Sequence, residues 1–284
     1  MSNVLITGAS GFIGHNLAGD MSADHTVVCF SRAPTEVAGV HAIEGDFTEP
    51  DDLCSLDGHP LDVIIHLGAV TGGCTEESGL RVNVSGAHHV LRYGIDRGVK
   101  KFVLASSIAV VGFQSLRFRP LKLPMPDDHP CLDRDGYGLS KYLMEEVTRY
   151  LVRQNDDLDI INIRLASIMP EESKPTPCQV GPLTEWAIGS LAKMYQSDAV
   201  RCFRMAAEAP HKSGVRILNA VGGQACTAAP VSDIIRGWYG ADADRIDLSH
   251  YERPGHERDP VYDIRLIERE IGFVPQRSVL EEEA

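Results

Sequence analysis

The sequence has few basic residues and no extended basic cluster. Its 284 residues include 27 Lys and Arg against 40 Asp and Glu, so the formal net charge is −13, and the longest basic run is Lys100-Lys101. A nucleic-acid partner requires a positive surface that neutralises phosphates. We therefore expect no nucleic-acid partner, and we interpret the acidic surface as a feature that favours solubility.

Cysteine pairs and long apolar runs are also absent from the sequence. The seven cysteines include no C-x-x-C pair, and their odd number favours reduced thiols over disulfides or a zinc site, so we predict no metal. No apolar run approaches the length of about 20 residues that spans a bilayer. The first predicted strand begins within the first residues, so we expect no signal peptide, no membrane partner and a cytoplasmic location.

A glycine-rich stretch near the start of the sequence gives the strongest signal of function. Val4–Ile6 is predicted to form a short apolar strand, and Gly8, Gly11 and Gly14 follow it before an amphipathic helix that opens at Phe12. Glycines at such spacing permit a tight turn, let the backbone approach a pyrophosphate and let the helix pack closely on the sheet. The helix N-terminus attracts the phosphates. This stretch therefore predicts a dinucleotide-binding site.

The end of the second predicted strand bears on the choice of dinucleotide. The apolar run Thr26–Phe30 is followed by Ser31 and Arg32, without a carboxylate. In this kind of fold an acidic residue here binds the ribose 2′-hydroxyl, whereas an arginine accommodates a 2′-phosphate. We expect NADP or NAD as the cofactor, with NADP favoured by Arg32; the alternative is that Arg32 is a solvated loop residue.

Strands and helices alternate through the first half of the chain. Further strands are predicted at His41–Phe47, Leu61–Ala69, Lys101–Ser106, Asp159–Arg164 and Val215–Ala220, with helices at 79–98, from Tyr137, and at 183–195. This alternation predicts an α/β fold with a Rossmann-type, doubly wound parallel sheet of about seven strands. Ligands of such sheets lie at the carboxyl ends of the strands. At that edge Asp46 either binds the adenine amino group or caps the next helix, and His66 is interpreted as a packed residue.

Three polar residues are predicted to carry the chemistry. The pair Ser106-Ser107 ends the fifth strand, and Tyr137 and Lys141 stand four residues apart on a helix, so the side chains of the tyrosine and the lysine face the same way. A lysine ammonium at that spacing stabilises a phenolate and lowers the pKa of the tyrosine. The tyrosine can then act as a general acid or base, the serine can hold the substrate oxygen, and a nicotinamide can exchange the hydride.

Several segments within the first 165 residues together resemble one family. The matching segments are Thr7–Gly14, Gly45-Asp46, His66–Ala69, Asn83–Gly86, Phe102–Ser107, Tyr137–Lys141 and Arg164. They resemble the extended short-chain dehydrogenases/reductases, also called the NAD-dependent epimerase/dehydratase family. The resemblance implies Ser107, Tyr137 and Lys141 as the catalytic set, with Lys141 also binding the nicotinamide ribose and Asn83 supporting the active-site helix. The expected cofactor-binding residues are Gly8, Ser10, Gly11, Phe12, Ile13, Gly14, Ser31, Arg32, Asp46, Phe47, Leu67, Gly68, Ala69, Asn83, Tyr137 and Lys141.

Departures from the family pattern narrow the expected reaction. Sugar-nucleotide dehydratases of this family carry an acidic pair where this sequence has Ile108-Ala109, so a dehydratase is rejected. The glycine-rich, arginine-containing segment that grips a nucleotide diphosphate in related enzymes is not found. The pattern Arg164-x-x-Ser167-x-x-Pro170-Glu171 looks closest to the uronate dehydrogenase-like branch. That branch pairs the substrate carboxylate with an arginine shortly before a tryptophan, and no arginine stands before Trp186, so a uronate substrate is not expected.

The expected organisation is a dinucleotide-binding domain and a small C-terminal substrate-binding lobe. The domain covers residues 1–165, with 197–222 returning to it, and the lobe covers 166–196 and 223–284, ending in a solvated acidic run at Glu281–Glu283. Thr71, Ser107 and Ser167 are expected to contact the substrate. The resemblance also suggests a homodimer.

The leading interpretation is an NAD(P)-dependent oxidoreductase that transfers a hydride at a hydroxyl or carbonyl carbon of a small sugar-derived substrate. The short segment before residue 197 favours net oxidation or reduction. A sugar-nucleotide epimerase is the alternative enzyme, and a non-catalytic NAD(P)-binding sensor is the alternative of another class. The sequence does not predict the individual substrate or the direction of the reaction.

Overall fold

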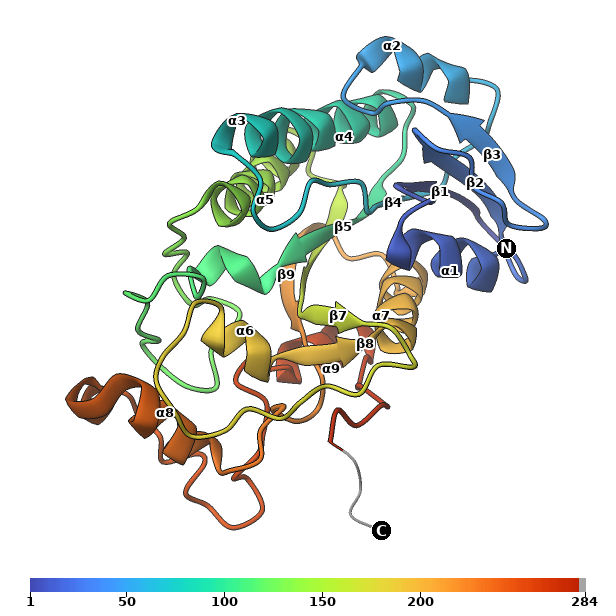
Figure 1. Cartoon of the computed structure of the whole chain (residues 1–284). Helices are drawn as coiled ribbons and strands as arrows, with labels where there is room; N and C mark the ends of the chain where they lie inside the picture. The colour runs from blue at the N-terminus through green and yellow to red at the C-terminus, as the bar shows by residue number, and fades with distance from the viewer. Residues whose placement is uncertain (281–284) are drawn as a thin grey trace. The chain divides into compact units, whose positions relative to one another are not determined.

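The structure, a computed structural model, describes residues 1–280, so the predicted acidic run at Glu281–Glu283 lies outside the described residues (Figure 1). The chain forms two compact units. The first comprises residues 1–106, 135–163 and 200–217, and the second comprises 107–134, 164–199 and the chain from 218 onwards. Residues 107–134 thus cluster with the second unit. The assignment of a dinucleotide-binding domain and a substrate-binding lobe to particular segments stays a prediction.

Seven strands form one parallel sheet, in the order β3-β2-β1-β4-β5-β6-β9 (Figure 1). The strands are β1 (Asn3–Thr7), β2 (Thr26–Ser31), β3 (His41–Glu44), β4 (Val63–His66), β5 (Lys101–Ser107), β6 (Asp159–Leu165) and β9 (Gly214–Ala220). The strand order reverses direction between β1 and β4, where ligands bind in doubly wound sheets. The predicted Rossmann-type α/β fold is therefore confirmed.

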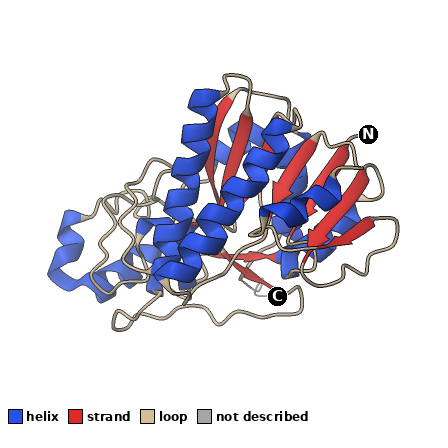
Figure 2. Ribbon diagram, turned by 90° about the horizontal axis from the view of Figure 1, so that it is seen from above, coloured by secondary structure: helices blue, strands red, loops and turns tan. Residues whose placement is uncertain are grey.

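Helices lie on both faces of this sheet (Figure 2). Helix α7 lies on the same face as α1, because Arg204 of α7 pairs with Asp20 of α1 at 3.2 Å; α4 and α5 pack on each other on the opposite face. The helices are α1 (Phe12–Met21), α2 (Pro50–Leu53), α3 (Glu76–Gly79), α4 (Ala87–Asp96), α5 (Gly136–Gln154), α6 (Ala187–Leu191), α7 (Gln196–Glu208), α8 (Val231–Tyr239) and α9 (Arg265–Ile271). Short turns of other helical types are η1 (Cys54–Leu56), η2 (Leu80–Gly86), η3 (Ile108–Val111) and η4 (Gly240–Arg245).

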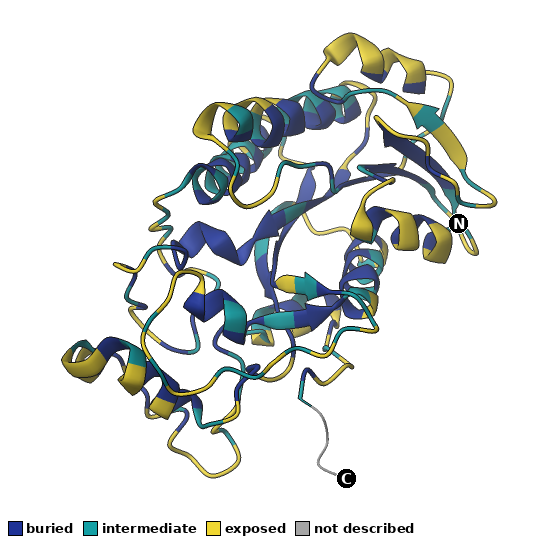
Figure 3. Ribbon diagram, in the orientation of Figure 1, coloured by how far each residue is buried: buried dark blue, intermediate teal, exposed yellow. Residues whose placement is uncertain are grey.

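The apolar strands form the core of the first unit. Leu5, Ile64 and Phe102 on β1, β4 and β5 are fully buried, whereas the edge strand β3 is largely exposed (Figure 3). A central parallel strand is covered by helices on both sides and is therefore apolar throughout. This explains why these strands can be recognised in the sequence. All seven cysteines are free thiols. Within residues 1–280, none of the helices combines the length and the apolar character that crossing a bilayer would require.

A buried ion network joins three strands of the first unit. Asp159, the first residue of β6, has no exposed surface. Its Oδ1 accepts a hydrogen bond from Arg216 Nη2 at 2.5 Å, and its Oδ2 accepts one from Lys101 Nζ at 3.2 Å. Lys101 also donates to the carbonyl oxygen of Ala209, just after α7. One carboxylate therefore holds the starts of β5 and β6, the strand β9 and the end of α7 together.

Two predicted helices differ from the observed elements. The predicted helix over 79–98 begins earlier, as α3, and passes through the π-helical turn η2 before it becomes α4. The predicted helix over 183–195 is wrong in extent, because only α6 is helical there. Residues Lys193–Tyr195 instead form β8, which pairs in parallel with β7 (Ser167–Met169) within the second unit.

Candidate functional site

The glycine-rich turn after β1 is built by backbone contacts that leave no room for side chains. Gly8 adopts a left-handed conformation with φ +73°, and a Cβ on this residue would lie 2.6 Å from the backbone nitrogen of Gly68. A Cβ on Gly14 would lie 2.4 Å from the carbonyl oxygen of Gly8. The predicted reasons for glycine at these two positions therefore hold: one permits the turn and the other permits close helix packing.

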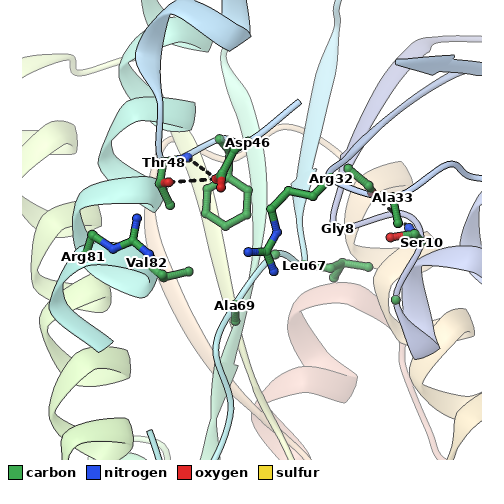
Figure 4. Close-up of a pocket in the computed structure, with 14 residues that line it drawn as sticks. Gly8, Ser10, Arg32, Ala33, Asp46, Thr48, Leu67, Ala69, Arg81 and Val82 are labelled. Carbon is green, nitrogen blue, oxygen red and sulfur yellow. Dashed lines mark hydrogen bonds between the residues drawn. The ribbon is translucent and has the colours of Figure 1, made fainter. Parts of the chain in front are cut away.

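A cavity of about 240 Å³ lies at the carboxyl ends of β1, β2, β3 and β4, within the first unit (Figure 4). Ten of the expected cofactor-binding residues line it: Gly8, Ser10, Gly11, Ser31, Arg32, Asp46, Phe47, Leu67, Gly68 and Ala69. The other lining residues are Ala33, Thr48, Arg81 and Val82, which were not predicted from the sequence. Its position at the reversal of strand order, together with the bare glycine backbone on one wall, fits a dinucleotide.

Two guanidinium groups face this cavity from different walls. Arg32 extends from the end of β2, and Arg81 extends from the π-helical turn η2 (Figure 4). Asp46, which also lines the cavity, lies close enough to both for their charge to lower the pKa of its carboxyl. Arg81 gave no signal in the sequence, because it belongs to no motif and its direction depends on the wide turn of the helix.

Asp46 has a local structural role. Its Oδ1 accepts hydrogen bonds from the backbone nitrogen of Thr48 at 2.9 Å and from Thr48 Oγ1 at 2.8 Å. Partial burial raises the pKa of the Asp46 carboxyl, but the two bonds from Thr48 and the nearby arginines lower it by more, so the net shift is downward. These bonds form a turn before α2, whose N-cap residue is Glu49, so Asp46 does not cap that helix, and adenine binding stays a prediction.

Helix α5 carries the predicted Tyr137 and Lys141. Asp135 caps the helix, because its Oδ1 accepts hydrogen bonds from the backbone nitrogens of Tyr137 and Gly138, both at 3.0 Å. Lys141 is 3% exposed, and its Nζ lies 6.0 Å from the centre of the Tyr137 ring. This Nζ donates to the carbonyl oxygen of Ala105, near the carboxyl end of β5, at 2.7 Å. The ammonium thus lies on the same helical turn as the phenol.

Burial sets the acidity of Lys141. Loss of solvation lowers the pKa of its ammonium to about 8, partly opposed by electrostatic interactions with the Cys74 and Glu145 side chains. Ser106 Oγ donates a hydrogen bond to Glu145 Oε1 at 2.6 Å, and both residues are buried. This fixed carboxylate one helical turn beyond Lys141 was not identified from the sequence. It helps to keep the lysine protonated near neutral pH.

Asn83 and His66 are buried and hydrogen bonded. Asn83 Oδ1 accepts from the backbone nitrogen of Val70, and its Nδ2 donates to Ser140 Oγ on α5, both at 2.9 Å. Asn83 therefore ties the loop after β4 to α5. His66 Nδ1 lies 2.6 Å from Thr7 Oγ1, and burial lowers the pKa of this imidazole to about 3, so His66 is a neutral, packed residue.

The remaining predicted residues are distributed between the two units. Ser107 is the last residue of β5, and its Oγ accepts a hydrogen bond from the backbone nitrogen of Ala109 at 3.1 Å. Ser107 and the exposed Ser167 belong to the second unit, whereas Thr71, Tyr137 and Lys141 belong to the first. The remaining expected cofactor-binding residues are not among those that line the cavity: Phe12, Ile13, Gly14, Asn83, Tyr137 and Lys141.

Curated proteins with similar sequences include several oxidoreductases and an epimerase. A 3 beta-hydroxysteroid dehydrogenase/Delta 5-->4-isomerase of Mycobacterium tuberculosis is 31% identical over 168 residues, which cover 55% of this chain and 43% of that protein. A UDP-glucose 4-epimerase of Vibrio cholerae is 28% identical, covering 64% and 60%, and a uronate dehydrogenase of Pseudomonas putida is 28% identical, covering 60% and 62%. The matches thus span less than two thirds of the length of each of these relatives.

Solved structures share the fold over nearly the whole chain. A mutated uronate dehydrogenase superposes with a TM-score of 0.68 at 21% identity, covering 98% of this chain and 82% of the other. A UDP-glucose 4-epimerase from Bifidobacterium longum, in complex with NAD+ and UDP, superposes with a TM-score of 0.72 at 17% identity, covering 98% and 95%. At these identities the likeness establishes the fold alone.

The family model that matches is described as the NAD dependent epimerase/dehydratase family, and it covers residues 4–192. This range includes the glycine-rich turn, the cavity and α5, and it is more than half of the chain. The chain therefore belongs to the NAD dependent epimerase/dehydratase family.

Proposed function

We propose that the protein is an NAD(P)-dependent oxidoreductase that transfers a hydride at a hydroxyl or carbonyl carbon of a small sugar-derived substrate. The observation that carries this proposal is the buried ammonium of Lys141, on the same turn of α5 as Tyr137 and anchored to Ala105 near the carboxyl end of β5. An ammonium in this position stabilises a phenolate, so Tyr137 can exchange a proton with the substrate hydroxyl.

Each residue of the site has a distinct proposed role. The residues around the cavity would hold the dinucleotide, whose nicotinamide supplies or accepts the hydride. Tyr137 acts as the acid or base, Lys141 lowers the pKa of its phenol, and Ser107 holds the substrate oxygen. Thr71 and Ser167 contact the rest of the substrate. The expected domain boundaries, the cytoplasmic location and the homodimer stay predictions.

The substrate class is supported by the pattern of residues that begins at the end of β6. By their names, the relatives act on steroids, sugar nucleotides and uronates, so family membership leaves the substrate open. The pattern from Arg164 to Glu171 and the short connection before α7 favour a small sugar-derived substrate. A sugar-nucleotide epimerase is the second candidate, favoured by the similarity to the Vibrio cholerae epimerase. A non-catalytic sensor is disfavoured, because such a protein has no need for both Tyr137 and Lys141.

A substrate screen tests the proposed function. Aldoses, aldonates, uronates, keto-sugars and a 3β-hydroxysteroid are each incubated with NAD or NADP, in the reduced form for the keto-sugars, and the absorbance of reduced nicotinamide is followed. We expect net turnover with one class of sugar-derived compound. Turnover of the steroid alone would contradict the substrate class. Tightly retained dinucleotide without net turnover, together with interconversion of UDP-sugars, would favour the epimerase. Binding of dinucleotide with no turnover of any compound would favour the sensor.

We further propose that the protein prefers NADP, because Arg32 and Arg81 both face the cavity. Hydrogen bonds to charged groups contribute about 1.5–3 kcal/mol. We therefore expect Arg32→Gln to weaken NADP binding by about 10- to 100-fold and to leave NAD binding nearly unchanged. The dissociation constants of both dinucleotides, measured by fluorescence titration, provide the test. Arg81→Gln should also weaken NADP binding.

The matched control is Arg97→Gln. Arg97 lies at the end of α4, pairs with Asp57 at 2.9 Å and does not line the cavity. This variant should bind both dinucleotides like the unmodified protein. Equal loss of NAD and NADP affinity in Arg32→Gln would mean that Arg32 contacts a part common to both dinucleotides, and the proposed preference would be wrong.

A further inference from the structure

The loop between η4 and α9 in the second unit brings two imidazoles and a carboxylate together. His250 Nε2 lies 2.7 Å from Asp259 Oδ2, and His256 Nδ1 lies 2.8 Å from the same oxygen. One donor atom from each of the three residues lies within 4.8 Å of the other two. The two imidazole rings are 5.2 Å apart and tilted by 55°, so each presents one nitrogen to the carboxylate without stacking on the other ring.

The backbone of this loop is held independently of the three side chains. Tyr251, which is 1% exposed, donates its hydroxyl proton to the carbonyl oxygen of Pro260 at 3.1 Å. The backbone nitrogen of His256 donates to the carbonyl oxygen of Arg253 at 3.0 Å, and that of Asp259 donates to the carbonyl oxygen of His256 at 3.2 Å. Because the loop is already ordered, a ligand bound by the three side chains would cost little further loss of conformational entropy.

We propose that His250, His256 and Asp259 form a binding site for a divalent transition-metal ion such as Zn²⁺. Two imidazole nitrogens and a carboxylate oxygen are a donor set that suits zinc, cobalt and nickel. Three protein ligands leave a fourth position for water or another ligand. The residue spacing is H-x5-H-x2-D, which contains no cysteine pair and matches no familiar zinc pattern, so the sequence alone gave no signal of a metal site.

Binding of an ion requires the three side chains to adjust their donor spacing. Bonds of about 2.0–2.1 Å to a tetrahedral ion place neighbouring donors about 3.3 Å apart. The two histidine–carboxylate donor pairs are now at 2.7 and 2.8 Å, so each has to lengthen by about half an ångström, and the two imidazole nitrogens, which lie within 4.8 Å of each other, have to reach the same spacing. The three residues are partly exposed, and Asp259 also lines a cavity of about 450 Å³. An ion can therefore reach the site from solvent.

The contact between Arg253 and His250 shows which ring nitrogen of His250 has to gain a proton when the metal binds. Arg253 Nη2 donates a hydrogen bond to His250 Nδ1 at 2.5 Å. A neutral imidazole that binds a metal through Nε2 carries its proton on Nδ1, so it can no longer accept this bond. The exposed Arg253 side chain therefore has to swing away when His250 binds the ion. It follows that Arg253 competes with metal binding. If the histidine cluster were purely structural, substitution of Arg253 would not change the affinity for metal.

Calorimetric titration of the tag-free protein with Zn²⁺, and absorption spectroscopy with Co²⁺, test the proposal. We expect one saturable site per chain with a micromolar or lower dissociation constant. His250→Gln, His256→Gln and Asp259→Asn should each weaken binding at least 10-fold, and Arg253→Gln should strengthen it. The control is His41→Gln, because the rings of His41 and His59 form another close histidine pair, 5.5 Å apart, in the first unit. This control variant should bind Zn²⁺ and Co²⁺ with the same affinity as the unmodified protein.

Circular dichroism of each variant without metal establishes whether it is folded. No saturable binding of Zn²⁺, Co²⁺ or Ni²⁺ at 100 µM would overturn the proposal, as would binding that His256→Gln leaves unchanged in a folded protein. If the histidine variants do not fold, Arg253→Gln decides, because it removes no ligand: unchanged metal affinity in this variant would contradict the assigned site. None of these measurements depends on dehydrogenase activity, so they stand apart from the proposed function.

Discussion

Replacement of Tyr137 by phenylalanine is expected to lower kcat by about 10²- to 10⁴-fold, which is the usual contribution of a general acid or base. The substitution removes only the hydroxyl that we propose exchanges the proton, so dinucleotide affinity should not change. The backbone nitrogen of Tyr137 would still be held by Asp135, and α5 should keep its start. The measurement is steady-state turnover of the substrate found in the screen, together with the dissociation constant of the dinucleotide.

The matched control for this variant is Tyr150→Phe. Tyr150 lies on the same helix, is exposed, and accepts a hydrogen bond from Gln154 Nε2 at 2.9 Å, so its loss should leave turnover unchanged. The pKa of Lys141, about 8, gives a second check. Its ammonium is present below this pH and lost above it, so turnover of the unmodified protein should fall as pH rises above about 8. Undiminished kcat in Tyr137→Phe would exclude the proposed acid/base role.

Replacement of Asp159 by alanine is expected to destabilise the protein by about 3–5 kcal/mol. The carboxylate is fully buried and accepts hydrogen bonds from Lys101 and Arg216. Its removal takes away the carboxylate that these two buried cations share, and breaking a buried ion pair by removing one partner is strongly destabilising. Chemical denaturation, which gives the free energy of unfolding by extrapolation to water, measures the effect.

A neighbouring exposed ion pair provides the control for Asp159→Ala. Asp157 and Lys100 also pair just before β6 and β5, but each side chain is 61% exposed. Exposed pairs contribute little to stability because water and salt screen them, so Asp157→Ala should change stability much less. If both variants lose the same stability, the buried network does not hold the strands together. Asp159→Asn keeps the shape of the side chain and part of its hydrogen bonding. Its loss of unfolding free energy should therefore lie between those of Asp159→Ala and Asp157→Ala.

Most of the sheet could be predicted because its signals are local. Strands such as β1 and β4 are continuous apolar runs bounded by glycine or polar residues, and their burial on both faces requires that pattern. The helix expected over 183–195 was wrong because its last part, Lys193–Tyr195, pairs with residues 167–169. That pairing is between segments distant in sequence, and it overrides the helical period of the apolar residues.

The sequence could indicate candidate site residues where the local structure imposes a fixed spacing. The glycines after β1 and the pair Tyr137 and Lys141 have spacings that the turn and the helix impose. Arg81 was missed because η2 is π-helical, and its wider turn changes which side chains face the cavity. The cluster of His250, His256 and Asp259 was missed for a similar reason: an irregular loop, not a helix or strand, brings the three residues together.

The π-helical turn η2 also has a mechanical consequence. Arg81 and Val82 line the cavity, and the next residue, Asn83, is clamped to Val70 and to Ser140 on α5. Only one or two peptide units separate Arg81 and Val82 from Asn83. A movement of the cavity-lining residues is therefore expected to shift Asn83, and with it the helix that carries Tyr137. Through Asn83, the wall of the cavity and the helix that carries Tyr137 are therefore mechanically connected.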